Sequence, residues 1–112
     1  MIVDKAWGKE TWHLNTDRLC LKWLDINAGW RCSTHRHIIK EEGFVVLAGK
    51  CVIWIEGKLF EANVGDIFHV PAGALHWFAV PPDELQPCRL LEFSTHHEDS
   101  DVERIHESGK FE

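Results

Sequence analysis

Several features are missing from this sequence of 112 residues, and each absence narrows the class of protein. No apolar run approaches the length of a membrane-spanning segment, and the first residues lack the apolar stretch of a signal peptide. The formal net charge is −6, so there is no basic excess to neutralise the phosphates of a nucleic acid. We therefore expect a cytoplasmic protein with neither a membrane nor a nucleic-acid partner.

Paired cysteines are absent too. The four cysteines, Cys20, Cys32, Cys51 and Cys88, are scattered, and none stands in a Cys-x-x-Cys motif. This spacing favours small apolar residues in a reducing compartment over a disulfide framework.

The chain has no heptad, internal repeat or low-complexity block, so we expect a single domain over residues 1–112.

Helical periodicity is also nearly missing, whereas short apolar or alternating segments recur between Gly and Pro turns. The predicted strands are 18–27, 44–48, 51–56, 67–70, 76–80 and 88–94. Residues 44–56 are predicted to form a hairpin around Gly49-Lys50. This pattern predicts an all-β, double-sheet jelly roll with its barrel core at 17–97 and an irregular acidic tail at 98–112.

The alternation in residues 18–27 makes one lysine stand out. Cys20, Leu24 and Ile26 share one side of the predicted strand, and Lys22 lies on that side as well. A lysine facing a core needs a partner for its charge, so Lys22 is the most informative lysine in the chain.

Tryptophans are abundant, at six residues, and we expect five of them to lie on outer faces. Trp7 and Trp12 are predicted to pack outside the barrel. Trp23, Trp54 and Trp77 would form apolar outer surface that a second copy covers, which predicts a homodimer.

The most informative stretch runs from Gly29 to Gly49. His35 and His37 are one residue apart, so on a strand both side chains point to the same face. A carboxylate on the next strand, from Glu41 or Glu42, can meet them there. Imidazole and carboxylate together suit Mn, Zn, Fe or Ni better than Ca or Mg.

A second stretch, Gly65 to His76, has similar glycine and proline punctuation around a histidine and supplies the remaining donor, His76. The other histidines have no such frame, and His69 is expected to pack against a sheet face. Because imidazoles bind a metal only when neutral, metal affinity should fall below about pH 6.

Both stretches resemble the two signature motifs of the cupin superfamily. The first has the spacing Gly, five residues, His-x-His, four residues, Glu, six residues, Gly; the second has Gly, five residues, Pro-x-Gly, two residues, His. The matching positions are Gly29, His35, His37, Glu42, Gly49, Gly65, Pro71, Gly73 and His76. The resemblance implies a cupin double-stranded β-helix with a divalent transition metal on His35, His37, Glu42 and His76. It also favours Glu42 over Glu41.

Weaker similarities over nearly the whole chain point to small sugar isomerases of the mannose-6-phosphate and lyxose isomerase types. They include Trp7-Gly8, Lys22-Trp-Leu24, Arg31-Cys-Ser33 and Val102-Glu-Arg104. They imply aldose–ketose isomerisation of a small sugar or sugar phosphate through an enediolate.

In that reading Lys22 stabilises the enediolate or acts as the base; the alternative is a structural ion pair between Lys22 and an internal carboxylate. Glu10, Arg31 and Arg104 are further candidates, for proton shuttling and for recognising hydroxyl or phosphate groups. An iron-dependent dioxygenase, or a non-catalytic cupin that binds a metal or a sugar, is the alternative, because a fold and a metal site do not establish turnover.

Overall fold

The computed structural model describes all 112 residues and contains no α-helix. Its strands are β1 (Ile2–Lys5), β2 (Gly8–Asn15), β3 (Cys20–Ile26), β4 (Trp30–Arg31), β5 (Thr34–His37), β6 (Glu42–Ala48), β7 (Cys51–Ile55), β8 (Lys58–Ala62), β9 (Ile67–Val70), β10 (His76–Ala79), β11 (Cys88–Ser94), β12 (Val102–His106) and β13 (Gly109–Lys110). A 3-10 turn, η1 (Asp99–Asp101), precedes β12. The structure therefore offers no helical segment that could span a membrane.

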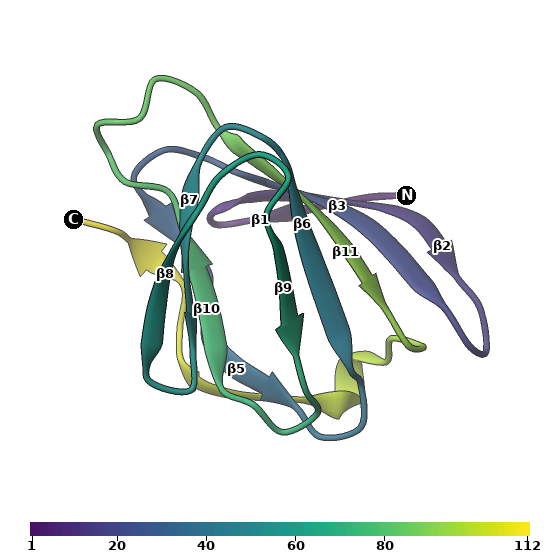
Figure 1. Cartoon of the computed structure of the whole chain (residues 1–112). Helices are drawn as coiled ribbons and strands as arrows, with labels where there is room; N and C mark the ends of the chain where they lie inside the picture. Colours follow the sequence, from purple (N-terminus) through teal and green to yellow (C-terminus); the bar gives the residue numbers. More distant parts are fainter.

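The strands form two antiparallel sheets that face each other (Figure 1). The first sheet has the order β1-β2-β3-β11-β6-β9. In the second sheet β10 is central: β4 and β5 pair with one edge, β7 pairs with the other, and β8 extends the sheet from β7. Two facing antiparallel sheets confirm the predicted jelly roll.

The inner faces of both sheets supply the core. In β3 the predicted alternation is confirmed, because Cys20, Lys22, Leu24 and Ile26 are buried while the residues between them are half-buried. All four cysteines are buried and free, as their scattered positions predicted. Burying this apolar surface is the main stabilising contribution, at roughly 25 cal/mol per Å².

The prediction that Trp7 and Trp12 lie outside the barrel is wrong. Trp7 is 6% exposed and meets Phe78 edge to face, with ring centroids 5.3 Å apart. Trp12 is half-buried and lines the internal cavity. Both residues precede the predicted barrel core, so the sequence pattern did not reveal that β1 and β2 extend the first sheet over the interior.

The predicted hairpin at residues 44–56 is also wrong. β6 pairs with β11 and β9 in the first sheet, whereas β7 belongs to the second sheet. Gly49 therefore carries the chain across the barrel, at φ 75°. A Cβ there would lie 2.5 Å from the Pro87 carbonyl oxygen, so a side chain does not fit. The actual hairpin joins β7 and β8 through Glu56-Gly57.

Residues 98–112 are not an irregular tail. β12 pairs with β5, and β13 pairs with β4, so this segment adds two strands to the second sheet. Asp101 fastens it to the loop after β5: its carboxylate accepts hydrogen bonds from the backbone amides of Ile38, Ile39 and Lys40 at 3.1, 2.8 and 2.9 Å. The segment is thereby held against the end of the barrel.

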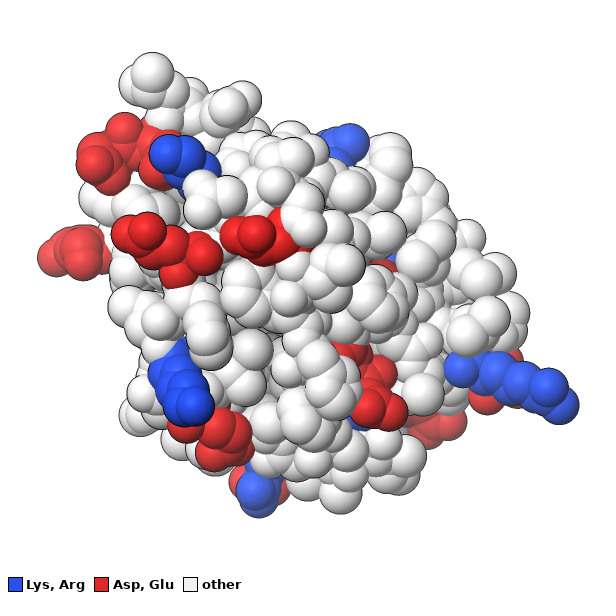
Figure 2. Space-filling view, viewed as in Figure 1, with Lys and Arg blue, Asp and Glu red and all other residues white.

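The face viewed in Figure 2 has a broad uncharged area between scattered charges. Exposed apolar residues on β8, β9 and the loop between them include Leu59, Val64 and Ile67, at 61%, 64% and 69% exposure. Trp54 and Trp77, on paired strands of the second sheet, stack nearly parallel with centroids 6.3 Å apart. Association of two copies through such outer surface stays a prediction.

Replacing Asp101 by alanine should lower the free energy of unfolding by about 1–2 kcal/mol at pH 7, since the carboxylate is only partly shielded from water. Partial burial acts to raise the pKa of Asp101, but the backbone amides outweigh it and the pKa is lowered. The stabilisation is therefore present above the usual carboxyl pKa and is lost as pH falls through the lowered value. Urea unfolding at several pH values measures it. The exposed Asp83, replaced by alanine, is the control, and equal losses in both variants would contradict the role of Asp101.

Candidate functional site

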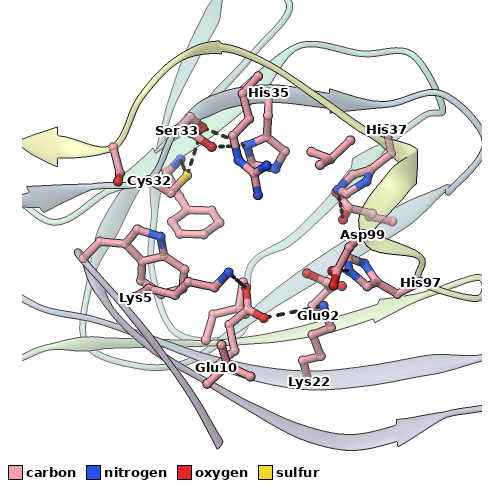
Figure 3. Close-up of a pocket in the computed structure, with 18 of the residues that line it drawn as sticks. Lys5, Glu10, Lys22, Cys32, Ser33, His35, His37, Glu92, His97 and Asp99 are labelled. Carbon is pink, nitrogen blue, oxygen red and sulfur yellow. Dashed lines mark hydrogen bonds and ion pairs between the residues drawn. The ribbon is translucent and has the colours of Figure 1, made fainter.

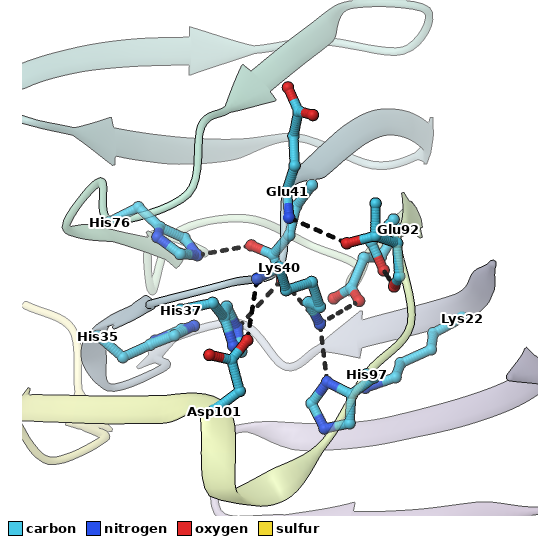
Figure 4. Close-up of polar contacts among 12 residues, drawn as sticks. Lys22, His35, His37, Lys40, Glu41, His76, Glu92, His97 and Asp101 are labelled. Carbon is cyan, nitrogen blue, oxygen red and sulfur yellow. Dashed lines mark hydrogen bonds and ion pairs between the residues drawn. The ribbon is translucent and has the colours of Figure 1, made fainter. Parts of the chain in front are cut away.

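The four predicted ligands meet at one end of the barrel interior. His35 and His37 lie on β5, and His76, which pairs with His35, begins the neighbouring β10. Glu42 begins β6 in the opposite sheet. Figure 4 shows these imidazoles grouped around the loop between β5 and β6. The structure therefore brings together side chains from two sheets, as the motif spacing implied.

Glu42 is the carboxylate that points inward. Its Oε1 lies 3.2 Å from His37 Nε2, and its Oε2 lies 3.0 Å from His76 Nε2. The ring centroids of His35 and His76 are 4.3 Å apart. Glu41 turns outward, where its exposed carboxylate pairs with the ring of His69. His69 is thus exposed and not packed against a sheet face, contrary to its prediction.

Backbone carbonyls set the protonation of two rings. Nδ1 of His35 contacts the Ser33 carbonyl oxygen at 2.8 Å, and Nδ1 of His76 contacts the Ala74 carbonyl oxygen at 2.9 Å. Because a carbonyl only accepts, each Nδ1 is assigned the proton, which leaves Nε2 of the neutral ring as a lone pair. Carbonyl-anchored imidazoles of this kind are the usual metal ligands.

The contact between His76 and Glu42 then needs a cation. Nε2 of His76 and Oε2 of Glu42 lie 3.0 Å apart, yet neither atom has a well-aligned hydrogen bond, and both are buried. Two acceptors this close repel each other unless a proton or a metal ion lies with them. Burial acts against charging His76, but Glu42 prevails and raises the pKa of His76. Burial lowers the pKa of His35 to about 3, so His35 is neutral and able to ligate.

A cavity of about 430 Å³ opens beside these residues, between the two sheets. Figure 3 shows His35 and His37 pointing into it from one side, with Glu10 and Lys22 on the other. Apolar side chains, including that of Trp7, line part of the cavity wall. Pockets of this size and mixed lining suit small molecules.

Lys22 faces the cavity as its alternation predicted. It is 2% exposed, its Nζ lies 3.6 Å from Glu10 Oε1, and it sits 3.9 Å from the centroid of the Trp12 ring. Trp12 Nε1 also donates to Glu10 Oε1, at 2.9 Å. Glu10 is thereby held beside the lysine, within the cavity lining.

Lys40 was not predicted from the sequence as a site residue, yet it lies beside Glu42 in the structure. Its ammonium lies 3.0 Å from Glu42 Oε1, 2.9 Å from Glu92 Oε2 and 2.8 Å from His97 Nδ1 (Figure 4). Burial acts to lower the pKa of Lys40, but Glu92 and Glu42 outweigh it and raise the pKa. Burial lowers the pKa of His97 to about 4, so its neutral Nδ1 accepts from Lys40.

Glu92 completes this network and was also missed. Burial first, and then the Glu42 charge, raise the pKa of Glu92 above its usual value, although Lys40 and Lys22 act in the opposite direction. The sequence did contain a signal for Glu92, because it lies at the same alternating, inward-facing positions of β11 as Cys88 and Leu90. For Lys40, which lies in a loop between strands, no periodicity offers such a signal.

The two arginine candidates lie in different places. Arg31 does not line the cavity; it donates to Thr34 Oγ1 at 3.2 Å and lies over the ring of Trp77 on the outer side. Arg104 does line the cavity, on β12 in register with His35. Of the two, only Arg104 is placed to meet a ligand.

The sequence-family model of the cupin domain matches residues 22–94, so the chain belongs to the cupin family. A D-lyxose/D-mannose isomerase of Thermosediminibacter oceani is 28% identical over 118 residues, covering 80% of this chain and 64% of that protein. A mannose-1-phosphate guanylyltransferase of Sinorhizobium fredii is 22% identical over 108 residues, covering 96% of this chain but 21% of that protein. The chain thus spans less than two thirds of either relative.

Solved structures agree on the fold. KdgF from Halomonas sp. superposes with a TM-score of 0.76 at 19% identity, over 89% of each chain. A likeness at this identity supports the architecture alone.

Cupins commonly bind transition metals, and the donor set here is compatible with one. In this conformation no three His, Cys, Asp or Glu side chains have the arrangement of a metal site. The chemistry nevertheless fits, because the Nε2 of His76 and the Oε2 of Glu42 are buried without aligned partners, and carbonyls orient two of the rings. His35, His37, Glu42 and His76 are the residues that would hold the ion.

Replacing Glu42 by glutamine should reduce affinity for Zn²⁺ or Mn²⁺ by roughly 100-fold, because the only anionic ligand of the set is lost. Calorimetric titration of metal-stripped protein measures this affinity. The matched control replaces the neighbouring, outward-facing Glu41 by glutamine, which should leave affinity unchanged. Equal affinities in wild type and the Glu42 variant would remove Glu42 from the ligand set.

Proposed function

We propose that this cupin is a metal-dependent isomerase that interconverts a small aldose and the corresponding ketose. The observation that carries the proposal is a pair of opposed groups in one cavity: imidazoles and Glu42 on one side, Lys22 with Glu10 on the other. Isomerisation requires that a proton leave one carbon and return to its neighbour while negative charge develops on oxygen. An acid–base pair facing a Lewis-acid site supplies both requirements.

Two residues of the chain supply the proton transfer and the charge stabilisation. Glu10 is the base: its carboxylate takes the proton from the carbon beside the carbonyl and returns it to the former carbonyl carbon, while the hydroxyl proton of the first carbon passes to the former carbonyl oxygen. Lys22, held by Glu10 and the face of Trp12, stays an ammonium and stabilises the enediolate oxygen. A metal bound by the three histidines and Glu42 would polarise substrate oxygens as a Lewis acid.

The substrate would lie against an apolar wall that excludes water. Leu24, Phe44 and Phe78 line the cavity and belong to the buried core. Arg104 at the opening would donate hydrogen bonds to hydroxyl groups. The similarity to the isomerase of Thermosediminibacter oceani supports this chemistry.

Replacing Lys22 by methionine should lower kcat by roughly 100-fold or more with metal affinity unchanged, because methionine keeps the volume but not the charge. Proton NMR of aldoses in D₂O, following exchange at the two carbons, measures turnover. Lys9, exposed on the neighbouring strand β2, is replaced by methionine as the control.

Two results would replace the proposal by another. Oxygen consumption by the Fe(II)-loaded protein, without carbon-bound exchange, would indicate a dioxygenase. Sugar binding without exchange in any metal form would indicate a non-catalytic cupin.

A further inference from the structure

The ionic groups around the cavity allow the substrate class to be narrowed, on the assumption that the proposed function holds. Four basic side chains line the cavity, from Lys5, Lys22, Lys40 and Arg104. Five carboxylates line it as well, from Glu10, Glu42, Glu92, Asp99 and Glu107. Among these side chains there is one more carboxylate than there are basic groups, so without a metal ion the lining opposes an incoming anion.

Three of the four basic side chains already have carboxylate partners. Lys40 is bound by Glu42 and Glu92 at 3.0 and 2.9 Å. Lys22 and Lys5 share Glu10, at 3.6 and 3.9 Å. A phosphate that bound Lys40 would weaken its contacts with the buried carboxylates of Glu42 and Glu92, which is unfavourable. A phosphate that bound Lys22 would compete with Glu10.

The remaining positive groups do not form a phosphate site. Arg104 is exposed on β12 and is the one lining cation without a carboxylate partner. The terminal ammonium of Met1 is exposed and contacts the Trp12 carbonyl oxygen at 3.4 Å. Phosphate recognition usually combines several cations with backbone amides, and a single exposed arginine does not provide that.

A divalent metal ion would add two positive charges at one end of the cavity, beside His35, His37 and His76, and the single charge of Glu42 offsets only one of them. The wall formed by Lys22, Glu10 and the apolar residues would keep its paired charges.

We infer that the cavity takes an uncharged polyhydroxy substrate, a free sugar, and discriminates against the sugar phosphate. Paired ions present both donors and acceptors to hydroxyl groups without requiring net charge. The apolar wall from Leu24, Phe44 and Phe78 faces the carbon skeleton. This inference rests on the proposed function but concerns binding, which is measured separately from turnover.

The test compares the binding of D-mannose, D-glucose and D-fructose with that of their 6-phosphates, by calorimetry and ligand-observed NMR on the metal-loaded full chain. At least one free sugar should bind with a Kd at least tenfold lower than its phosphate. Tighter binding of every phosphate, or no binding of any free sugar at millimolar concentration, would overturn the inference. Binding of a free sugar without isomerisation would refute the isomerase and leave the inference standing.

A variant tests whether ion pairing causes the preference for free sugars over sugar phosphates. Glu10→Gln keeps the acceptor for Trp12 but releases Lys22 and Lys5 from their carboxylate, so phosphate affinity should rise at least fivefold relative to the free sugar. Glu61→Gln, the same change on the exposed strand β8, should alter neither affinity. An unchanged preference in the Glu10 variant would show that ion pairing does not set the selectivity. Tight phosphate binding by wild type that disappears in Arg104→Ala would show that Arg104 alone is a phosphate site.

Discussion

The carboxylate of Glu42 is the group on which the rest of the site depends. It is 3% exposed and has His37, His76 and Lys40 within 3.2 Å. Burial alone would raise its pKa, but His37, His76 and Lys40 hold the pKa well below the usual value. A buried anion requires such partners, since an unpaired one costs several kcal/mol. The positions of the histidines and of Lys40 are therefore tied to a single acidic side chain.

Strand register extends this constraint across the first sheet. Trp12 is paired with Lys22, Lys22 with Glu92, and Glu92 with Phe44, so these side chains form one row on the inner face. Successive residues on a strand alternate faces, and a slip by one residue would turn the row outward and expose the core. The same hydrophobic register that stabilises the barrel thus fixes where its charges lie.

Much of this arrangement could be predicted from local patterns. His35 and His37 reach one face by strand alternation, Glu42 follows them closely in sequence and meets them from the opposite sheet, and Lys22 is recognisable as a charge on an apolar face. The errors share a different cause. Whether Gly49 turns a hairpin or carries the chain to the opposite sheet depends on which distant strand each side pairs with, and local sequence does not contain that information. Trp7 was misplaced for the same reason.

Lys40 shows most clearly what local sequence patterns do not predict. Its position follows from a loop that Asp101 fastens from the far end of the chain, and its partners Glu92 and His97 are 52 and 57 residues away in sequence. No periodicity describes such a residue. Only the folded arrangement shows that a lysine next to two adjacent glutamates turns inward with one of them.

Stability alone does not account for a buried network of this kind. Well-packed apolar residues of similar volume are often as stabilising as a buried ion pair, or more so. The network does hold each charged group by several directed contacts, which fixes its position before any ligand arrives. Lys40 has three partners, and Glu10 is bound by both Lys22 and Trp12. Polar groups fixed in this way need little reorganisation when charge develops on a bound molecule, which is the condition under which electrostatic stabilisation is most effective. The ionic lining is therefore consistent with the ligand binding proposed for the cavity and is not required for the stability of the fold.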